Sequence, residues 1–491
     1  MHGLLPIRLP PPYVWLSYGP DALHTRGGFG VTHSGFPQMR CLTLALASAF
    51  TLAAALPRTL DAQDSGRIQL DTFVLSNGLR VVLAPDHSTQ VVAVNVWYNV
   101  GSRNEQAGRT GFAHLFEHMM FQGSANVPKG AHMSMIAQAG GQMNGSTQDD
   151  RTNYWEVLPS NRYNMGLWLE ADRMRSLAIT QASFENQRET VKEERRLRID
   201  NQPYTGAFLK GVTAPFDSKT CFAYGHELIG SMTDLNAAKT DDVKAFFDLY
   251  YAPNNATLTL VGDFDPAEAR TLIQQYFGGI PRAKDAPPVV CEAKFNAGEK
   301  RESVTDEKAT LPALLRIFLV PEYRHQDHAA LELLATILGS GESSRMNRAI
   351  AREAKAALAT QVGLDVTGPH RGPSTFAALA IANQGVSTDS LDKLISIEIA
   401  KVVADGVTDT ELTKAKNNRR ANAIFGRQQA LNTAESIQNA TMYLGSPSAI
   451  NTDLERYMKV TRDDIKRVAQ QYLRSDNSVV ILIKPPEGPR P

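Results

Sequence analysis

The stretch His114-Leu115-Phe116-Glu117-His118 contains two histidines and a glutamate and is the strongest indication of function in the chain. Its two histidines are four residues apart, so in a helix they lie on one face and both imidazoles can reach one ion. Neutral imidazole suits Zn²⁺, and a carboxylate beside a metal-bound water, here Glu117, can take a proton from that water. A helix that carries two histidines by chance is the alternative, but the complete inverted pattern His-x-x-Glu-His favours a zinc site.

The surrounding segment, residues 101–124 (GSRNEQAGRTGFAHLFEHMMFQGS), resembles the active-site segment of the pitrilysin/insulinase family of zinc peptidases. More narrowly, it is similar to that of the bacterial relatives of the mitochondrial processing peptidase. The family takes a third ligand, a glutamate, from a second motif, and Glu194 lies at the family's spacing after His118 (194 − 118 = 76). The resemblance thus implies His114, His118 and Glu194 as zinc ligands, water in the fourth position, and Glu117 as general base. Such an open site is typical of catalytic zinc.

The helix that carries Glu194, expected over residues 183–199, is densely charged. A solvated face with ion pairs between residues four apart explains most of these charges, including Glu193 and most of the arginines. Glu194 is distinguished from them only by its distance from His118.

The resemblance extends over most of the chain and implies an α+β fold of two similar lobes. Each lobe is expected to be a mostly antiparallel sheet with packed helices, and the two together to enclose a cavity. We expect an N-terminal extension with a signal peptide (1–62), a zinc-bearing peptidase lobe (63–285), a linker (286–305) and an inactive related lobe (306–491).

An internal repeat agrees with two related halves. The segment 243–255 is echoed by 465–477 (465 − 243 = 222), and Gly123-Ser124 is echoed by Gly339-Ser340 (339 − 123 = 216). In the second register the residues that correspond to His114, Glu117 and His118 are Ala330, Leu333 and Leu334. The second half therefore repeats the scaffold and replaces the metal chemistry with core residues.

Two strand pairs can be expected from turn residues and β-rich runs. Asn77-Gly78 lies between two such runs and predicts a hairpin. The polar run Gln142–Trp155 is also strand-like, and in the family the matching strand is an exposed edge to which a substrate peptide adds as an extra strand. Asn144 is carried over from the family as a candidate substrate contact. A hairpin whose polar residues only cap the turn is an equally good interpretation.

Composition excludes some functions and indicates export. The formal net charge of the 491 residues is zero, so no basic footprint for nucleic acid is present. Met39-Arg40, the apolar run 41–56 and Ala62 have the form of a secretory signal at about 39–62, which predicts a periplasmic or secreted protein. A disordered tail is the alternative, and the apolar run is too short for a confident membrane span. Met39 is a better candidate for the true start than Met1.

Only two cysteines, Cys221 and Cys291, follow the expected signal. In an exported protein they can pair, but the sequence does not decide whether they are close.

The chain departs from the family's pattern at two places. Many single-chain members carry a glutamate where Gln187 stands, seven residues before the third ligand (194 − 7 = 187). Active single-chain and homodimeric members also carry an arginine and a tyrosine in the second half, where this chain has Ala351 and Leu358, with Arg352 one position away. The missing pair predicts a homologous partner subunit without the zinc motif, in a heterodimer; a homodimer is the alternative.

The sequence therefore predicts a zinc metalloendopeptidase that hydrolyses unfolded peptides or small polypeptides. A non-catalytic, peptide-binding subunit of a peptidase complex is the alternative from another class. A maturation protease for one dedicated peptide is a second alternative.

Overall fold

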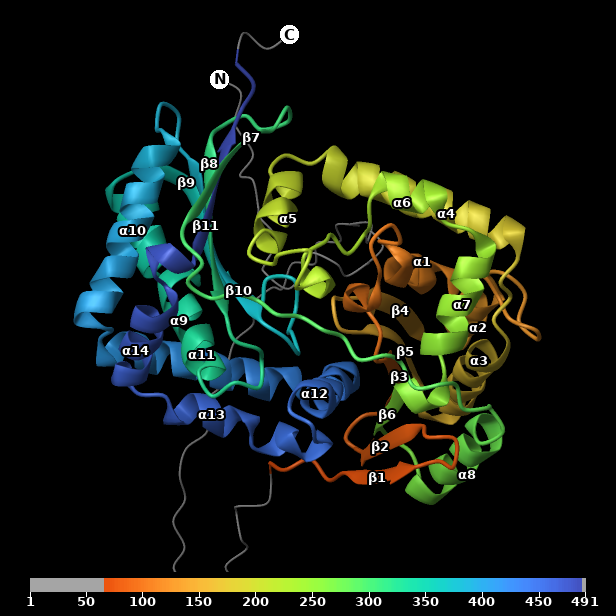
Figure 1. Ribbon diagram of the computed structural model, residues 1–491. Coiled ribbons are helices and arrows are strands. Elements are labelled where there is room, and N and C mark those ends of the chain that lie inside the picture. The colour runs from red at the N-terminus through yellow and green to blue at the C-terminus, as the bar shows by residue number, and fades with distance from the viewer. Residues whose placement is uncertain (1–65, 488–491) are drawn as a thin grey trace, which may run out of the picture. The chain divides into compact units, whose positions relative to one another are not determined.

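The first sheet is built from the first half of the chain (Figure 1). Its central strands are rich in valine and leucine. The computed structural model describes residues 66–487, so the predicted extension and signal peptide, 1–62, lie outside the described residues. The strand order is β1-β2-β6-β3-β5-β4, with β2 and β6 parallel and the other pairs antiparallel. The strands are β1 Asp71–Val74, β2 Arg80–Pro85, β3 Val91–Tyr98, β4 Gln142–Thr147, β5 Thr152–Pro159 and β6 Ala256–Gly262.

The predicted hairpin at Asn77-Gly78 is confirmed, with β1 and β2 paired antiparallel around it. Gly78 has φ +93°, a left-handed conformation that glycine adopts without steric cost.

The second sheet repeats the first except for β1, which has no counterpart in it. Its order, β7-β11-β8-β10-β9, matches β2-β6-β3-β5-β4, and its single parallel pair, β7 with β11, occupies the same place. The strands are β7 Lys300–Thr305, β8 Ala313–Val320, β9 Ala357–Leu364, β10 Ser374–Ala382 and β11 Ser478–Lys484. The α+β fold with two similar halves is confirmed.

The repeat extends to individual hydrogen bonds. The side-chain amide of Asn255 donates to the carbonyl of Tyr250 at 2.8 Å, and that of Asn477 donates to the carbonyl of Tyr472 at 2.9 Å. Each amide donates a second hydrogen bond to a backbone carbonyl. The acceptor is Asn99 in the first half and Leu319 in the second. The predicted correspondence of 243–255 with 465–477 is therefore present in the structure.

Helices cover the sheets. In the first half they are α1 Phe112–Met119, α2 Ala131–Gln138, α3 Tyr163–Ser176, α4 Gln181–Arg195, α5 Thr205–Thr213, α6 Met232–Ala237, α7 Thr240–Tyr250 and α8 Pro266–Phe277. In the second half they are α9 His328–Gly339, α10 Thr388–Asp405, α11 Asp409–Gly426, α12 Ala430–Tyr443, α13 Asp453–Lys459 and α14 Arg462–Tyr472. Short 3-10 or π segments are η1 Ser102–Asn104, η2 Ser160–Arg162, η3 Arg196–Asp200, η4 Phe222–Tyr224, η5 Pro253–Asn255, η6 Asn347–Glu353, η7 Pro447–Asn451 and η8 Ser475–Asn477.

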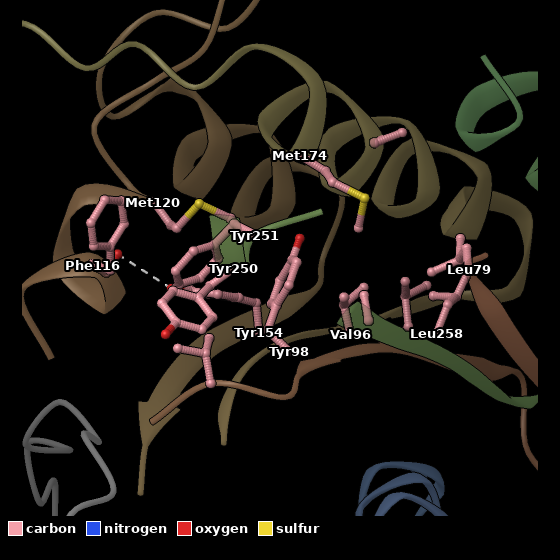
Figure 2. Packing of buried hydrophobic residues seen from close by; sticks show 14 of the residues in the cluster. Leu79, Val96, Tyr98, Phe116, Met120, Tyr154, Met174, Tyr250, Tyr251 and Leu258 are labelled. Carbon is pink, nitrogen blue, oxygen red and sulfur yellow. Dashed lines mark hydrogen bonds between the residues drawn. The ribbon is translucent and has the colours of Figure 1, made fainter. Parts of the chain in front are cut away.

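The core of the first half holds α1 against the sheet (Figure 2). Phe116 of α1 stacks on Tyr251 with ring centroids 5.0 Å apart, and its carbonyl accepts a hydrogen bond from the hydroxyl of Tyr154 on β5. Because Phe116 lies between the two histidines, its burial fixes the opposite face of α1, which carries them.

Each half lends one helix to the other sheet. α12 packs on β3 and β6 of the first sheet through Ala434, Ile437 and Ala440 (Figure 1). α5 packs on β8 and β11 of the second sheet, where Ala207 contacts the apolar face. Both sheets are thus covered on two faces, which explains why the central strands β3, β6 and β8 are buried along almost their whole length.

The connection between the halves, residues 281–299, has no regular secondary structure, and the predicted linker 286–305 ends in β7. Cys291 in this connection forms a disulfide with Cys221. The domain limits and the enclosed cavity stay predictions. Among residues 66–487 no helix is both long and apolar enough to cross a membrane.

Candidate metal centre

Helix α1 is held at its N-terminus by a buried carboxylate. Glu105 accepts backbone hydrogen bonds from Gly111 and Ala113, each at 2.8 Å, and so satisfies donors that the first turn leaves without partners. His226 lies 3.0 Å from the same carboxylate. Sequence reasoning assigned Glu105 no role; its acidic side chain shortly before a helix is the signal that was available.

The structure brings together the three predicted ligands. Glu194 Oε2 lies 3.7 Å from His114 Nε2 and 3.2 Å from His118 Nε2. All three candidate ligand atoms lie within 4.8 Å of one another. Two ligands of a tetrahedral zinc with bonds of about 2 Å are roughly 3.3 Å apart, so the spacing suits one such ion.

Burial keeps both histidines neutral. It lowers the pKa of His118 to about 4 and that of His114 well below its ordinary value. At neutral pH the contacts with Glu194 are therefore not ion pairs, and the imidazoles have the protonation state that metal binding requires.

Glu194 presents one oxygen to the histidines and the other to an arginine. Oε2 is buried without a hydrogen-bond partner, whereas Oε1 lies 3.3 Å from Nε of Arg198. Burial raises the pKa of Glu194 to about 7, and the positive charge of Arg198 opposes this rise. A buried acceptor oxygen that faces two neutral imidazoles is stabilised by a cation. These residues therefore fit zinc.

Two further residues, Arg198 and Gln187, contact the predicted ligands, and the sequence drew attention only to Gln187, as a departure from the family's pattern. Arg198 follows Glu194 by four residues, the spacing at which helical side chains meet, but it was grouped with the solvated charges. A hydrogen bond with Gln187 raises the pKa of His118, against the larger lowering effect of burial. Nε2 of His118 faces Glu194. The amide of Gln187 thus contacts one of the predicted zinc ligands.

Glu117 lies beside this group and is held by the end of β4. Thr147 donates to it from its hydroxyl, at 2.7 Å from Oε2, and also from its backbone N–H. Burial raises the pKa of Glu117 to about 7, against the lowering effect of these bonds. A carboxylate that titrates near neutral pH is suited to accept and return protons. The sequence offered no signal for Thr147 beyond its place in a polar strand.

The other predicted positions lie in three elements, β4, η6 and β9. Asn144 lies on β4, an edge strand paired only with β5, and its Oδ1 accepts from Gly145. It is three residues from Thr147, so the two side chains point to opposite faces of the strand. Ala351 and Arg352 lie in η6 and Leu358 in β9. A role for Asn144 in binding substrate stays a prediction.

The second half has apolar residues where α1 has its ligands. The side chains of Ala330, Leu333 and Leu334 on α9 are buried in the second core.

A second group of residues of the kind that bind metals, His132, Glu156 and Glu170, already has its negative charge compensated by an arginine. His132 Nε2 lies 3.0 Å from Glu156, and Arg173 binds Glu170 through two nitrogens in the same buried cluster. The guanidinium takes the place that a metal cation would occupy. Within residues 66–487 the group of His114, His118 and Glu194 is therefore the better metal candidate.

Comparison with known proteins identifies the family to which the chain is similar. Two family models match: "Insulinase (Peptidase family M16)" over residues 80–206 and "Peptidase M16 inactive domain" over residues 237–419. The zinc protease PqqE of Helicobacter pylori is 29% identical over 424 residues, which cover 84% of this chain and 93% of that protein. A "Probable mitochondrial-processing peptidase subunit beta" of Arabidopsis thaliana is 23% identical, covering 84% of this chain and 77% of that protein.

Among solved structures, the crystal structure of a protease from Helicobacter pylori has a TM-score of 0.80 and 27% sequence identity. The match covers 85% of this chain and 100% of the Helicobacter pylori chain.

Proposed function

Because the chain belongs to peptidase family M16, the insulinase family, and brings two histidines and one glutamate together beside the buried Glu117, we propose that it is a zinc metalloendopeptidase. Its substrates are unfolded peptides or small polypeptides. The observation that carries the proposal is the contact of Glu194 Oε2, buried and without a hydrogen bond, with two neutral imidazoles.

His114, His118 and Glu194 would hold the metal. The chemistry that zinc supplies in such a site is Lewis acidity towards water and the peptide carbonyl. Glu117 accepts a proton from the attacking water and returns it to the leaving amine. Thr147 holds the Glu117 carboxylate in place between these two steps.

The edge strand β4 is the proposed seat of the substrate. β4 pairs with β5 on one side only, so its other side can accept a peptide as an added strand. Thr147 ends this strand and contacts Glu117, so a peptide added to β4 has its backbone near the catalytic base.

Replacement of Glu117 by glutamine tests the proposal. Glu117→Gln keeps the shape and the bond from Thr147 but cannot take a proton, so we expect peptide hydrolysis to fall about 10²–10⁴-fold with zinc content unchanged. Glu193→Gln, an exposed position on α4, is the matched control and should leave both unchanged. Hydrolysis at the wild-type rate by Glu117→Gln would refute the role of the base. It would favour the alternative, a non-catalytic peptide-binding subunit.

A homologous partner subunit without the zinc motif is part of the proposal. Its motivation is the absence of an arginine and a tyrosine at Ala351 and Leu358. One relative is named as a single subunit of a mitochondrial processing peptidase, which agrees with such a pairing. Copurification from the native source is the test, and a monomer or homodimer with full activity would contradict the heterodimer.

Export to an oxidising compartment, the periplasm or the exterior, is proposed on two grounds. The segment 39–62 has the form of a secretory signal, and Cys221 and Cys291 form a disulfide, which persists in oxidising compartments. Fractionation of the native cells tests it, and a cytosolic protein with both thiols free would contradict it.

A further inference from the structure

A loop of the second half reaches the hairpin that holds the catalytic base. The loop joins β9 to β10 and comprises residues 365–373; we call it the arm. It contacts the turn between β4 and β5, residues 148–151, through two neighbouring aspartates. Thr147, the residue before this turn, is the one that binds Glu117.

The first contact is a buried ion pair between His370 and Asp149. Nε2 of His370 lies 2.8 Å from Oδ2 of Asp149, and Nδ1 lies 3.0 Å from the carbonyl of Pro373. Both ring nitrogens face acceptors, so the imidazole satisfies both only when it is doubly protonated. Ser102 binds the other oxygen of Asp149 at 2.7 Å, which fixes the carboxylate from the first half as well.

The second contact joins the residues that follow this pair, Arg371 of the arm and Asp150 of the turn. The backbone N–H of Arg371 donates to Oδ2 of Asp150 at 2.6 Å. Tyr224 donates to the other oxygen of Asp150 at 2.9 Å and accepts from the backbone N–H of Gly372 at 3.0 Å. The arm and the turn are therefore joined by a network in which Asp150 has a partner on both oxygens.

Two glycines allow the turn and its neighbours to approach this closely. A Cβ on Gly368 of the arm would lie 2.9 Å from the side chain of Gln148. A Cβ on Gly101 would lie 2.1 Å from the backbone carbonyl oxygen of Gln148. The turn is thus packed between a segment of the first half and the arm of the second.

We propose that the arm is a positioning device for the reaction: His370 and Arg371 fix the turn at 148–151 and thereby hold Thr147 on Glu117. This rests on the proposed peptidase function for its kinetic part. His370 acts through Asp149 and is a positioning residue, since it contacts neither the ligands nor Glu117. A loop of the second half would thus support the catalytic base of the first half.

A double-mutant cycle in hydrolysis tests the kinetic part. We expect Thr147→Val, which removes the hydroxyl donor, to lower kcat about tenfold, as loss of a supporting bond at a catalytic site does. His370→Gln should lower kcat in the wild-type background. In the Thr147→Val background it should add less than about twofold, because both changes act on the same contact. Effects that multiply in the double variant would overturn the proposal.

Hydrogen exchange tests the structural part without any activity. His370→Gln, and independently Asp149→Asn, should speed amide exchange over residues 142–151 by about fivefold or more, while α1 keeps its protection and the zinc content is unchanged. The matched control is Asn451→Ala, which breaks a different contact between the halves, the pair of 2.9 Å bonds with Ile68. It should leave the exchange of 142–151 as it is.

The outcomes separate this inference from the proposed function. A wild-type chain without zinc or hydrolysis would defeat the proposed function, and exchange would still decide whether the arm fixes the turn. A wild-type chain that hydrolyses peptides, with His370→Gln and Asp149→Asn unchanged in exchange and in kcat, would defeat the arm alone.

Discussion

Glu435 of α12 accepts a hydrogen bond from Asn153 of β5 at 2.7 Å, although the two residues are 282 positions apart. The same oxygen, Oε1, accepts from Asn95 at 2.6 Å and from the indole of Trp97 at 3.3 Å. One carboxylate of the second half thus satisfies three donors on the first sheet. It anchors α12 on the face of the sheet opposite α1.

Glu435→Ala should therefore destabilise the protein markedly. The amides of Asn95 and Asn153, both buried, lose their acceptor, and we expect the free energy of unfolding to fall by about 2–4 kcal/mol. Glu435→Gln keeps an acceptor oxygen and should cost less than half of this. Denaturant unfolding of the two variants measures the difference, and equal losses would show that the three bonds do not anchor the helix.

The repeated asparagines predict matched effects in the two halves. Asn255→Ala removes two hydrogen bonds to backbone carbonyls and should cost about 2 kcal/mol in free energy of unfolding. Asn477→Ala removes the corresponding pair and also the bond that its Oδ1 accepts from the backbone N–H of Asn296, so it should cost the same or about 1 kcal/mol more. A loss in only one of them, measured by denaturant unfolding, would mean that the shared hydrogen bonds do not carry equal weight.

The disulfide between Cys221 and Cys291 closes a loop across a sequence separation of 70 residues. Loop-closure entropy predicts that reduction lowers the free energy of unfolding by about 4 kcal/mol. The unfolding midpoint of the wild-type chain should therefore fall when a reductant is added. A double variant, Cys221→Ser with Cys291→Ser, is the control and should not respond. A wild-type midpoint that is also insensitive to reductant would contradict the bond.

The ion pair of His370 and Asp149 predicts a pH dependence of stability. Contact with Asp149 raises the pKa of His370 from 6.5 to about 9 despite burial, so its contribution is complete below pH 6.5 and is lost as the pH rises through about 9. The pKa of Asp149 is below its ordinary value of 3.8, so its contribution is complete above that pH and is lost as the pH falls further.

The stability difference between the wild-type chain and His370→Gln should therefore be largest between about pH 4 and 6.5 and shrink by on the order of 3 kcal/mol towards pH 9. Other charged groups around the ring, Asp150 and Asp365, act in the same direction. A difference that stays constant from pH 6 to 10 would show that His370 is neutral in the folded protein.

Local patterns in the sequence were sufficient for the two related halves and for the pair of histidines on α1. The helix spacing of His114 and His118 and the repeat of 243–255 in 465–477 depend on short-range geometry, which the chain displays directly. Glu194 needed a family spacing, since on α4 its charge is one among many.

Contacts between distant segments could not be predicted from the sequence. The pairing of Cys221 with Cys291, the bond of Thr147 to Glu117 and the placement of α12 on the first sheet depend on tertiary packing, which no period or spacing encodes. Arg198 was missed for a different reason. It pairs with Oε1 of Glu194 at a spacing of four residues, and such ion pairs are ordinary on a solvated helix.

Zinc per chain, measured by elemental analysis on the purified chain from Gln63 onward, tests the central claim most directly. The account predicts about one zinc per chain in the wild type and in Glu193→Gln, and a loss or at least tenfold weakening of zinc binding in Glu194→Gln, which removes the charged ligand. Absence of zinc from the wild-type chain supplied with the metal, or full retention by Glu194→Gln, would contradict the site.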